Sequence, residues 1–303
     1  MKIIVTGADG FVGEYLIPRL IKDKHELFLI GNDIESLKER HGNNNLCLSY
    51  IDLDQNKLID KINKFSPETV IHLAAFSTAS DAFTDMENLF SANILFLGKI
   101  LDALKKTNLK SFIYTGSSTE YSKGDDLFNP AYLYSATKTA GRSILNYYSD
   151  IYNFKSIFIT PYNVYGGINP KKKIIDLLYD SLNSDSPVDT TKGNQELDFI
   201  HIIDLVDLYC KIIDNLNVIP NNTNFKAGTG VGHSLRELAA LLERFSGKET
   251  NINWGGIPYR TKDTMYAVAN ISNQKEILNW NHQINLEQGV RMFLETKAKS
   301  NKL

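Results

Sequence analysis

The chain begins with a short apolar strand that runs directly into a glycine-rich turn. Residues 2–7, KIIVTG, are followed by glycines at a Gly-x-x-Gly-x-x-Gly spacing, at Gly7, Gly10 and Gly13. Glycine at these positions allows a tight turn and close approach of the backbone to a bound group, and the next segment, FVGEYLIPRL, has a helical pattern. A pyrophosphate can then face the N-terminus of that helix, whose N–H groups and dipole favour negative charge. The turn therefore predicts a dinucleotide-binding βα unit.

Strand-like and helix-like segments alternate from residue 2 to about residue 160. Short apolar runs such as ELFLIG, TVIHLAA, SFIYTGS and SIFITP are separated by longer segments of helical period. This alternation is typical of βαβ units in a parallel sheet with helices on both faces. We predict an α/β protein with a Rossmann doubly wound parallel sheet, formed by a dinucleotide-binding domain of residues 1–165. We expect residues 166–303 to form a smaller mixed region that mainly binds substrate and partly returns to the sheet.

Composition points to a small-molecule partner. The chain has 303 residues, a formal net charge of −2, and two cysteines that lie in apolar runs. These features predict neither a basic nucleic-acid-binding surface nor a metal site. No segment has the pattern of a signal peptide or of a membrane span. We therefore expect a cytoplasmic protein that binds no metal, nucleic acid or membrane.

A second pattern places Tyr134 four residues before Lys138, in YLYSATK. On a helix this spacing puts both side chains on one face. A phenol that exchanges protons near neutral pH needs its pKa lowered from about 10 to about 7, which is worth about 4 kcal/mol, and a protonated Lys one turn away favours the phenolate. The spacing alone is weak evidence, because a chain with this many Tyr and Lys residues is expected to contain such a pair by chance; it is the motifs described next that make Tyr134 the predicted proton donor or acceptor and Lys138 the group that adjusts its pKa.

Further motifs follow one another along the whole chain. They are TGADGFVG, VIHLAA, SANILFLGKILDAL, TGSSTEY, YLYSATK, PYNVYG, LDFIHIIDLVD and GTGVGHSLRELAALL. In this order they resemble the extended short-chain dehydrogenase/reductases of the NAD-dependent epimerase/dehydratase family, which act on nucleotide-sugars. The resemblance implies a bound NAD(P) and a nucleotide-diphosphate sugar as substrate. It also implies that Ser117 steadies the reacting sugar oxygen, with Ser118 as second choice, and that Lys138 binds the nicotinamide ribose.

The resemblance also assigns the cofactor contacts. The predicted cofactor-binding residues are Gly7, Gly10, Phe11, Val12, Gly13, Asn32, Asp33, Asp52, Leu53, Leu73, Ala74, Ala75, Asn93, Tyr134, Lys138 and Pro161. The second strand of such folds usually ends in a carboxylate that binds the adenosine ribose and repels a 2′-phosphate. Here Gly31 stands in that place, which leaves room for a phosphate and favours NADPH. Because no Arg follows directly and Asp33 could turn back to the ribose, the choice between NAD and NADP stays open.

Two departures from the family narrow the expected reaction. Its 4,6-dehydratases carry an Asp-Glu pair after the catalytic hydroxyl, where this chain has Ser118 and Thr119, and hydroxyls cannot replace carboxylates as acid and base. The cysteine of the 3,5-epimerase-reductases is also missing from GSSTEY. We predict an NAD(P)H-dependent reduction of an NDP-4-keto-6-deoxysugar at C4, in nucleotide-sugar and polysaccharide biosynthesis. The alternatives are a 4-epimerase that keeps NAD bound and a cofactor-binding protein without catalysis.

The last expectations concern the substrate and a second subunit. The predicted substrate-binding residues are Ser117, Ser118, Thr119, Asn163, Lys192 and Arg260. In much of the family an Arg binds a phosphate where this chain has Leu197, so we expect Arg260 in YRTKD to carry most of the diphosphate charge. The family also pairs two helices across a dimer, which predicts a homodimer through residues 86–107 and 131–153.

Overall fold

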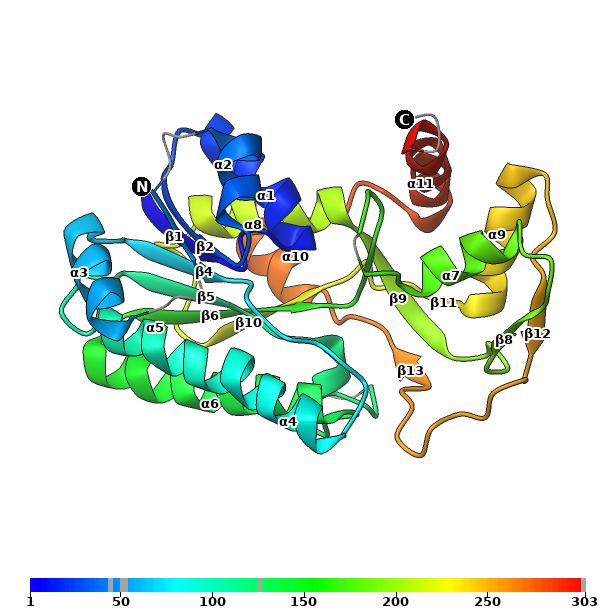
Figure 1. Cartoon of the computed structure of the whole chain (residues 1–303), viewed down its shortest axis with the longest axis horizontal. Helices are drawn as coiled ribbons and strands as arrows, with labels where there is room; N and C mark the ends of the chain where they lie inside the picture. The colour runs from blue at the N-terminus through cyan, green and yellow to red at the C-terminus, as the bar shows by residue number, and fades with distance from the viewer. Residues whose placement is uncertain (43–45, 50–53, 125–126, 170, 301–303) are drawn as a thin grey trace.

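The larger part of the molecule is built on a parallel sheet (Figure 1). The computed structural model describes residues 1–42, 46–49, 54–124, 127–169 and 171–300. Within them, a seven-stranded sheet has the order β10-β6-β5-β4-β1-β2-β3, and all neighbouring strands are parallel. The strands are β1 (Lys2–Thr6), β2 (Glu26–Gly31), β3 (Leu46–Ser49), β4 (Thr69–His72), β5 (Ser111–Thr115), β6 (Lys155–Pro161) and β10 (Thr223–Ala227). The strand order reverses between β1 and β4, where folds of this kind bind ligands.

Helices cover both faces of this sheet (Figure 1). One face carries α1 (Phe11–Lys22), α2 (Ile34–His41), α8 (Ile202–Asp214) and α10 (Ser272–Leu278). The other carries α3 (Gln55–Phe65), α4 (Phe83–Phe90), the π-helical turn η1 (Ser91–Leu95), α5 (Phe96–Leu104) and α6 (Leu133–Tyr152). Successive strand residues point to opposite faces, so Ile3 and Val5 join the core under α1 and α8, whereas Ile4 joins the core under α5 and α6. The predicted α/β class with a doubly wound parallel sheet is confirmed.

A smaller part of the molecule begins after β6 and lies beyond the carboxyl ends of the strands of the large sheet (Figure 1). A mixed sheet joins β7 (Asn163–Tyr165), β9 (Glu196–His201), β11 (Gly232–Ser234) and β13 (Tyr266–Ala267), and β8 (Val188–Thr190) pairs with β12 (Ile252–Trp254). The helices α7 (Ile174–Ser181), α9 (Leu235–Ser246) and α11 (Leu286–Ser300) pack around a core of their own. Although they follow residue 165, β10 is a strand of the large sheet and α8 and α10 pack against it. The two parts are therefore interleaved along the chain.

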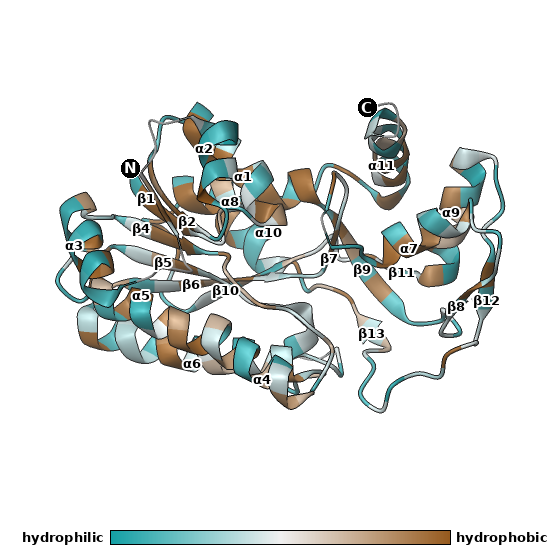
Figure 2. Cartoon of the chain, viewed as in Figure 1, coloured by the Kyte–Doolittle hydropathy of each residue, from teal (hydrophilic) through white to brown (hydrophobic). Residues whose placement is uncertain are grey.

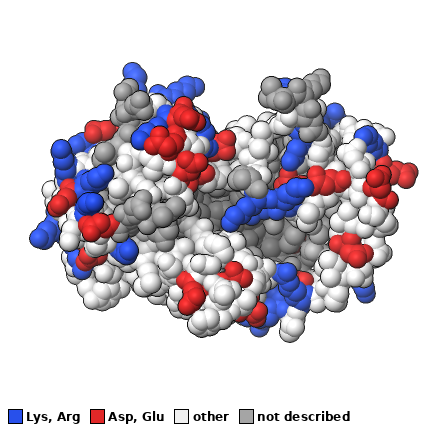
Figure 3. All heavy atoms as spheres, viewed as in Figure 1, with Lys and Arg blue, Asp and Glu red and all other residues white. Residues whose placement is uncertain are grey.

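Hydropathy agrees with this layering. Figure 2 shows apolar residues along β1 and β2, and both apolar and polar residues on the helices that cover the sheet. Figure 3 shows both signs of charge interspersed over one face, with Lys or Arg side chains at the hollow between the two parts. Among the described helices, none combines the length and the apolar character that crossing a membrane requires.

Candidate active site

A crevice lies at the carboxyl ends of β1, β2 and β4. Its volume is about 510 Å³. The lining residues are Gly7, Asp9, Gly10, Ile30, Gly31, Asn32, Leu73, Ala74, Ala75, Phe76, Asn88, Ser91, Ala92, Phe96 and Lys171. The crevice therefore brings together the glycine turn, the end of β2 and the segment after β4, as the sequence predicts for a dinucleotide.

The glycine turn fits a dinucleotide through its backbone. Gly7 has φ +66°, and a Cβ there would lie 2.6 Å from the backbone N of Ala74. The N–H of Gly10 donates to the carbonyl of Gly7 at 3.0 Å, and Gly10 is the N-cap of α1 without a side-chain cap. The turn is thus closed by backbone alone and opens the helix N-terminus toward the crevice, where a pyrophosphate is favoured. Phe11, Val12 and Gly13 form the first turn of that helix.

The end of β2 differs from the expectation. A Cβ on Gly31 would lie 2.7 Å from Oδ1 of Asp9, so the room expected beside Gly31 is filled by a carboxylate. Asp33 does not turn toward the crevice, because its Oδ1 accepts the Ser36 N–H at 3.0 Å and caps α2. The expectation that Gly31 leaves space for a phosphate is therefore wrong for this structure. Asp52 and Leu53, also predicted as cofactor contacts, lie outside the described residues.

Asn93 lies behind the crevice, in η1. Its side chain is 1% exposed and accepts the Phe76 N–H at 2.9 Å. Its amide donates to the Phe76 carbonyl at 3.0 Å and to Thr137 Oγ1 at 2.9 Å. The amide thereby ties the segment after β4 to the helix that carries Tyr134, which is how it can support the site geometry. Pro161 closes β6, at the same edge of the sheet.

The predicted catalytic residues meet at the end of β5. Ser117 follows that strand in an extended conformation, and Tyr134 and Lys138 lie one turn apart in α6. The Ser117 side chain lies close enough to Tyr134 to lower the pKa of its phenol, against the larger opposite effect of burial. Ser117 Oγ also shares a hydrogen bond with Thr119 Oγ1 at 2.7 Å, and Lys138 Nζ lies 4.5 Å from the centroid of the Tyr114 ring. The structure therefore brings the Ser, Tyr and Lys together from two elements.

The protonation of this pair differs from the expectation. Burial raises the pKa of Tyr134, the nearby Glu120 carboxylate raises it further, and the Ser117 side chain opposes both only in part. Burial lowers the pKa of Lys138 to about 8, against the effect of Glu120 and together with that of Arg142. Lys138 thus does not bring the Tyr134 pKa down here, because burial disfavours both charges. At neutral pH Tyr134 remains a phenol, which is the state that a proton donor needs.

A buried ion pair under the catalytic residues was not predicted from the sequence. Glu120 is 0% exposed and accepts two hydrogen bonds from Arg142, at 2.7 and 3.2 Å. Glu120 Oε1 also accepts the Ser117 N–H at 2.6 Å, and Arg142 donates to Thr160 Oγ1 at 2.7 Å. The pair joins the catalytic loop, α6 and β6. Its only sequence signals are a Glu three residues after Ser117 and an Arg four residues after Lys138.

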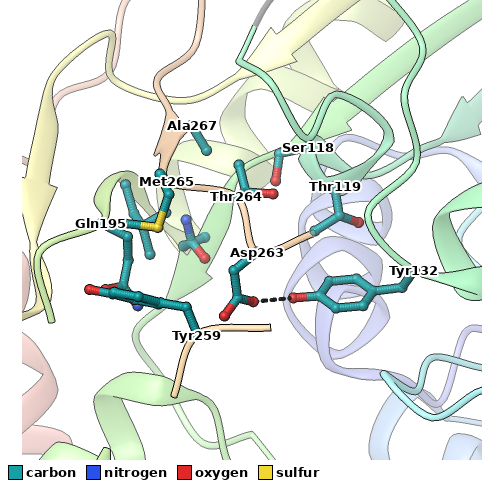
Figure 4. Close-up of a pocket in the computed structure, with 11 residues that line it drawn as sticks. Ser118, Thr119, Tyr132, Gln195, Tyr259, Asp263, Thr264, Met265 and Ala267 are labelled. Carbon is teal, nitrogen blue, oxygen red and sulfur yellow. Dashed lines mark hydrogen bonds between the residues drawn. The ribbon is translucent and has the colours of Figure 1, made fainter. Parts of the chain in front are cut away.

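A second pocket adjoins Ser117, between the two parts of the molecule. Figure 4 shows side chains from both parts facing it, and its volume is about 140 Å³. The lining residues are Ser118, Thr119, Tyr132, Asn163, Gln195, Leu197, Tyr259, Asp263, Thr264, Met265 and Ala267. Of the predicted substrate contacts, Ser118, Thr119 and Asn163 line this pocket. The other polar lining residues were not predicted, and YRTKD in the loop before β13 was singled out only for Arg260; they are Tyr132, Gln195, Tyr259, Asp263, Thr264 and Met265.

Three predicted substrate residues lie outside the lining of this pocket: Ser117, which adjoins it in the chain, Arg260 and Lys192. Arg260 is exposed but adjacent, with its guanidinium 5.5 Å from the centroid of the Tyr132 ring. Lys192 is exposed, and its carbonyl accepts the Arg236 Nε–H at 2.8 Å. Asn163 Nδ2 donates to the Asp198 carbonyl at 3.1 Å, which holds it at the pocket wall.

Comparison with known proteins identifies the family. Residues 3–228 match the NAD dependent epimerase/dehydratase family. The chain belongs to this family. A CDP-abequose synthase of Yersinia pseudotuberculosis is 29% identical over 284 residues, which cover 92% of this chain and 96% of the relative. A UDP-glucose 4-epimerase of Mycolicibacterium smegmatis is 25% identical over 314 residues, covering 97% and 98%.

Solved structures share the fold. The UDP-glucose 4-epimerase of Thermotoga maritima with UDP-glucose has a TM-score of 0.87 at 21% identity, covering 99% of this chain and 100% of that one. The UDP-glucose 4-epimerase of Thermus thermophilus in complex with NAD has a TM-score of 0.83 at 19% identity, covering 98% of each. At this identity the likeness establishes the architecture of this family member and not its substrate.

The first prediction concerns the Glu120 carboxylate. Glu120→Gln removes the charge that raises the Lys138 pKa and leaves Arg142 unopposed, so the Lys138 pKa should fall below its value of about 8. We expect kcat/KM for carbonyl reduction to decline as pH rises through the Lys138 pKa, and the decline to begin at lower pH in the variant. Profiles of kcat/KM between about pH 6 and pH 10 measure the midpoint.

Two further variants separate charge from folding. Breaking a buried pair costs about 3 to 5 kcal/mol, so Glu120→Gln should also unfold at lower temperature. The double variant Glu120→Gln/Arg142→Gln removes both charges, and its pH midpoint should lie nearer the parent's. Glu249→Gln, an exposed carboxylate, serves as control. A folded Glu120→Gln enzyme with the parental midpoint contradicts the assigned role.

Proposed function

We propose that this protein reduces the C4 carbonyl of a nucleotide-diphosphate 4-keto-6-deoxysugar with NADH or NADPH. The observation that carries the proposal is the placement of Ser117 and Tyr134 side by side, with Tyr134 held as a phenol and the next residues, Ser118 and Thr119, lining the pocket. A phenol can donate a proton to a carbonyl oxygen, and a neighbouring hydroxyl can hold that oxygen in place. The crevice at the glycine turn accommodates the dinucleotide, which supplies the hydride when bound.

The residues have distinct tasks in this reaction. Ser117 Oγ holds the carbonyl oxygen of the sugar next to the Tyr134 hydroxyl. As the carbonyl carbon is reduced, Tyr134 gives its proton to the oxygen and the carbonyl becomes a secondary alcohol. Lys138, while protonated, stabilises the charge that develops on Tyr134. Glu120 and Arg142 hold Ser117 and α6 in the required arrangement.

The pocket chemistry favours reduction over dehydration. Among its described lining residues the only carboxylate is Asp263, which accepts the Tyr132 hydroxyl at 3.3 Å and the Arg260 N–H at 2.7 Å. Glu120 is nearby but committed to Arg142. Elimination of water needs a positioned acid and a positioned base, and the pocket presents hydroxyls and amides in their place. Two of the relatives, from Yersinia pseudotuberculosis and Salmonella typhimurium, are CDP-abequose synthases, which supports a CDP-linked sugar as a candidate.

The second prediction tests reduction directly. Purified protein is incubated with NADH or NADPH and with CDP-, UDP-, GDP- and dTDP-linked 4-keto-6-deoxysugars. We expect one nucleotide series to consume reduced cofactor and to give one equivalent of the 4-hydroxy sugar. Tyr134→Phe should lower kcat by about 10² to 10⁴, the usual contribution of a positioned proton donor. Tyr147→Phe, an exposed tyrosine on the same helix, should leave kcat unchanged.

Other outcomes identify the alternatives. Interconversion of an NDP-sugar with its C4 epimer, without net consumption of NAD(P)H, would show a 4-epimerase, as the UDP-glucose 4-epimerases among the relatives are named. Cofactor binding with equal turnover in the parent and in Tyr134→Phe would show a binding protein without this catalysis.

We propose further that Arg260 binds the sugar diphosphate, with help from Asn163 and Lys192. Leu197, where a phosphate-binding Arg was expected, lines the pocket as an apolar residue. Arg260 lies at the pocket mouth beside Tyr132, where a guanidinium can fork onto phosphate oxygens. Its exposure leaves the guanidinium accessible to a ligand.

The third prediction concerns this residue. Arg260→Ala should raise KM for the nucleotide-sugar at least about tenfold, because a charged hydrogen bond is worth about 1.5 to 3 kcal/mol. Lys262→Ala is the control, since Lys262 lies in the same segment but donates to the Pro130 carbonyl at 2.7 Å. Steady-state kinetics distinguish the two variants. An unchanged KM in Arg260→Ala means that the phosphates bind elsewhere.

We also propose a homodimer through the predicted segments 86–107 and 131–153. Exposed apolar side chains lie on both, including Phe90 and Leu95 on one and Tyr147, Ile151 and Tyr152 on the other. The elements α4 and η1 contact α6, so these side chains can form one continuous apolar surface. An exposed apolar area of this kind marks an association site.

The fourth prediction follows from this surface. Leu95→Glu and Ile151→Glu should convert a dimer into a monomer, because each introduces a charge that association would bury. Sedimentation velocity gives the mass directly. Val218→Glu changes an exposed apolar residue outside both segments and should leave the dimer intact. A monomeric parent, or variants that remain dimeric, would contradict the proposal.

A further inference from the structure

Asp9 occupies an unusual place in the cofactor crevice. It lies in the glycine turn, between Gly7 and Gly10, and its side chain reaches across to the end of β2. Its Oδ2 accepts the N–H groups of Asn32 at 2.8 Å and of Asp33 at 3.0 Å. Its Oδ1 faces Gly31, where a Cβ would come within 2.7 Å. The carboxylate therefore stands beside the position from which a strand-end carboxylate would normally act.

The two N–H groups explain why the carboxylate stays there. Consecutive backbone N–H groups at a turn form a concave site for an anion. In this chain the Asp9 carboxylate fills that concavity: its Oδ2 accepts both N–H groups, and its Oδ1 is left to accept from a ligand hydroxyl. Asp9, Gly31 and Asn32 all line the crevice, so this oxygen pair borders the space available to a dinucleotide.

The same occupancy disfavours a phosphate. A 2′-phosphate on the adenosine would have to approach a full negative charge and would find the two backbone donors already taken. The cations of α2 that could compensate are also paired. Arg40 contacts Glu14 at 3.8 Å and the Ser36 carbonyl at 3.2 Å, and Lys38 contacts Glu35 at 2.9 Å. Lys171 lines the crevice too, with its Nζ over the Phe76 ring beyond β4.

We infer that Asp9 is the residue that selects the cofactor, by binding the adenosine ribose hydroxyls of NAD(H) and repelling the 2′-phosphate of NADP(H). Gly31 is part of this arrangement, because any side chain at that position would collide with the Asp9 carboxylate. The selecting carboxylate has moved from the strand to the glycine turn. The inference rests on the dinucleotide site of the proposed function and is independent of which sugar is reduced.

Binding of NADH and NADPH to the purified protein, without any sugar, forms the test and the fifth prediction. Isothermal titration should give a Kd for NADH at least tenfold lower than for NADPH in the parent, equivalent to about 1.4 kcal/mol. Asp9→Asn keeps the size of the side chain and removes the charge, and should reduce this ratio at least tenfold. Asp33 lies in the turn after β2, and its carboxylate caps α2. Asp33→Asn should therefore leave the ratio of the two Kd values unchanged.

A double variant that moves the carboxylate from residue 9 to residue 31 tests whether the preference for NADH can be restored. In Asp9→Ser/Gly31→Asp the nearer neighbour of a new side chain at residue 31 is gone, which leaves Leu37 Cδ1 at 3.0 Å from its Cβ, and the preference for NADH should return. Circular dichroism and thermal unfolding confirm that each variant is folded. Equal or tighter binding of NADPH by the parent overturns the inference alone, as does a ratio that changes in Asp33→Asn but not in Asp9→Asn. A parent that binds neither dinucleotide overturns the inference together with the proposed reaction.

Discussion

The buried ion pair of Glu120 and Arg142 is the interaction on which the active-site arrangement depends. The two residues come from the loop after β5 and from α6, and the pair also reaches Ser117 and Thr160. Burying two charges costs several kcal/mol, which only good geometry and full hydrogen bonding offset. Here the carboxylate accepts from Arg142 in a fork and from the Ser117 backbone, and Arg142 lies against the Phe158 ring. The ion pair therefore ties the loop that carries Ser117 to the helix that carries Tyr134.

The charges of this pair also change the pKa values of the catalytic residues: Glu120 affects Tyr134 and Lys138, and Arg142 affects Lys138. Lys138 is buried and Tyr134 is half-buried, and this desolvation favours the neutral form of each. Glu120 strengthens this effect on Tyr134 and opposes it on Lys138, so a neutral phenol and a partly protonated amine can coexist near neutral pH. That combination suits proton donation to a carbonyl oxygen. In an oxidation Tyr134 must first lose its proton, which this environment resists.

The sequence predicted the features that depend on local chemistry. Alternating apolar runs and the spacing of Gly7, Gly10 and Gly13 define the parallel sheet and its glycine turn, and the four-residue spacing of Tyr134 and Lys138 defines a helix face. What could not be predicted depends on contacts between distant segments. Glu120 meets Arg142 across 22 residues, and Asp9 meets Asn32 across 23. Such pairs have no period in the sequence. The Tyr134 pKa was predicted in the wrong direction because burial is also a property of the assembled fold.

The place of Asp9 illustrates why a motif position does not by itself assign a role. The requirement at the ribose is a carboxylate near the end of β2, and any element that reaches that point can supply it. Because β1 and β2 are neighbours, the turn after β1 lies beside the end of β2. Packing then explains why residue 31 is a glycine, since the Asp9 carboxylate fills the volume that a side chain there would need. Reading residue 31 alone suggests an open site for a phosphate, whereas the two positions together describe a closed one.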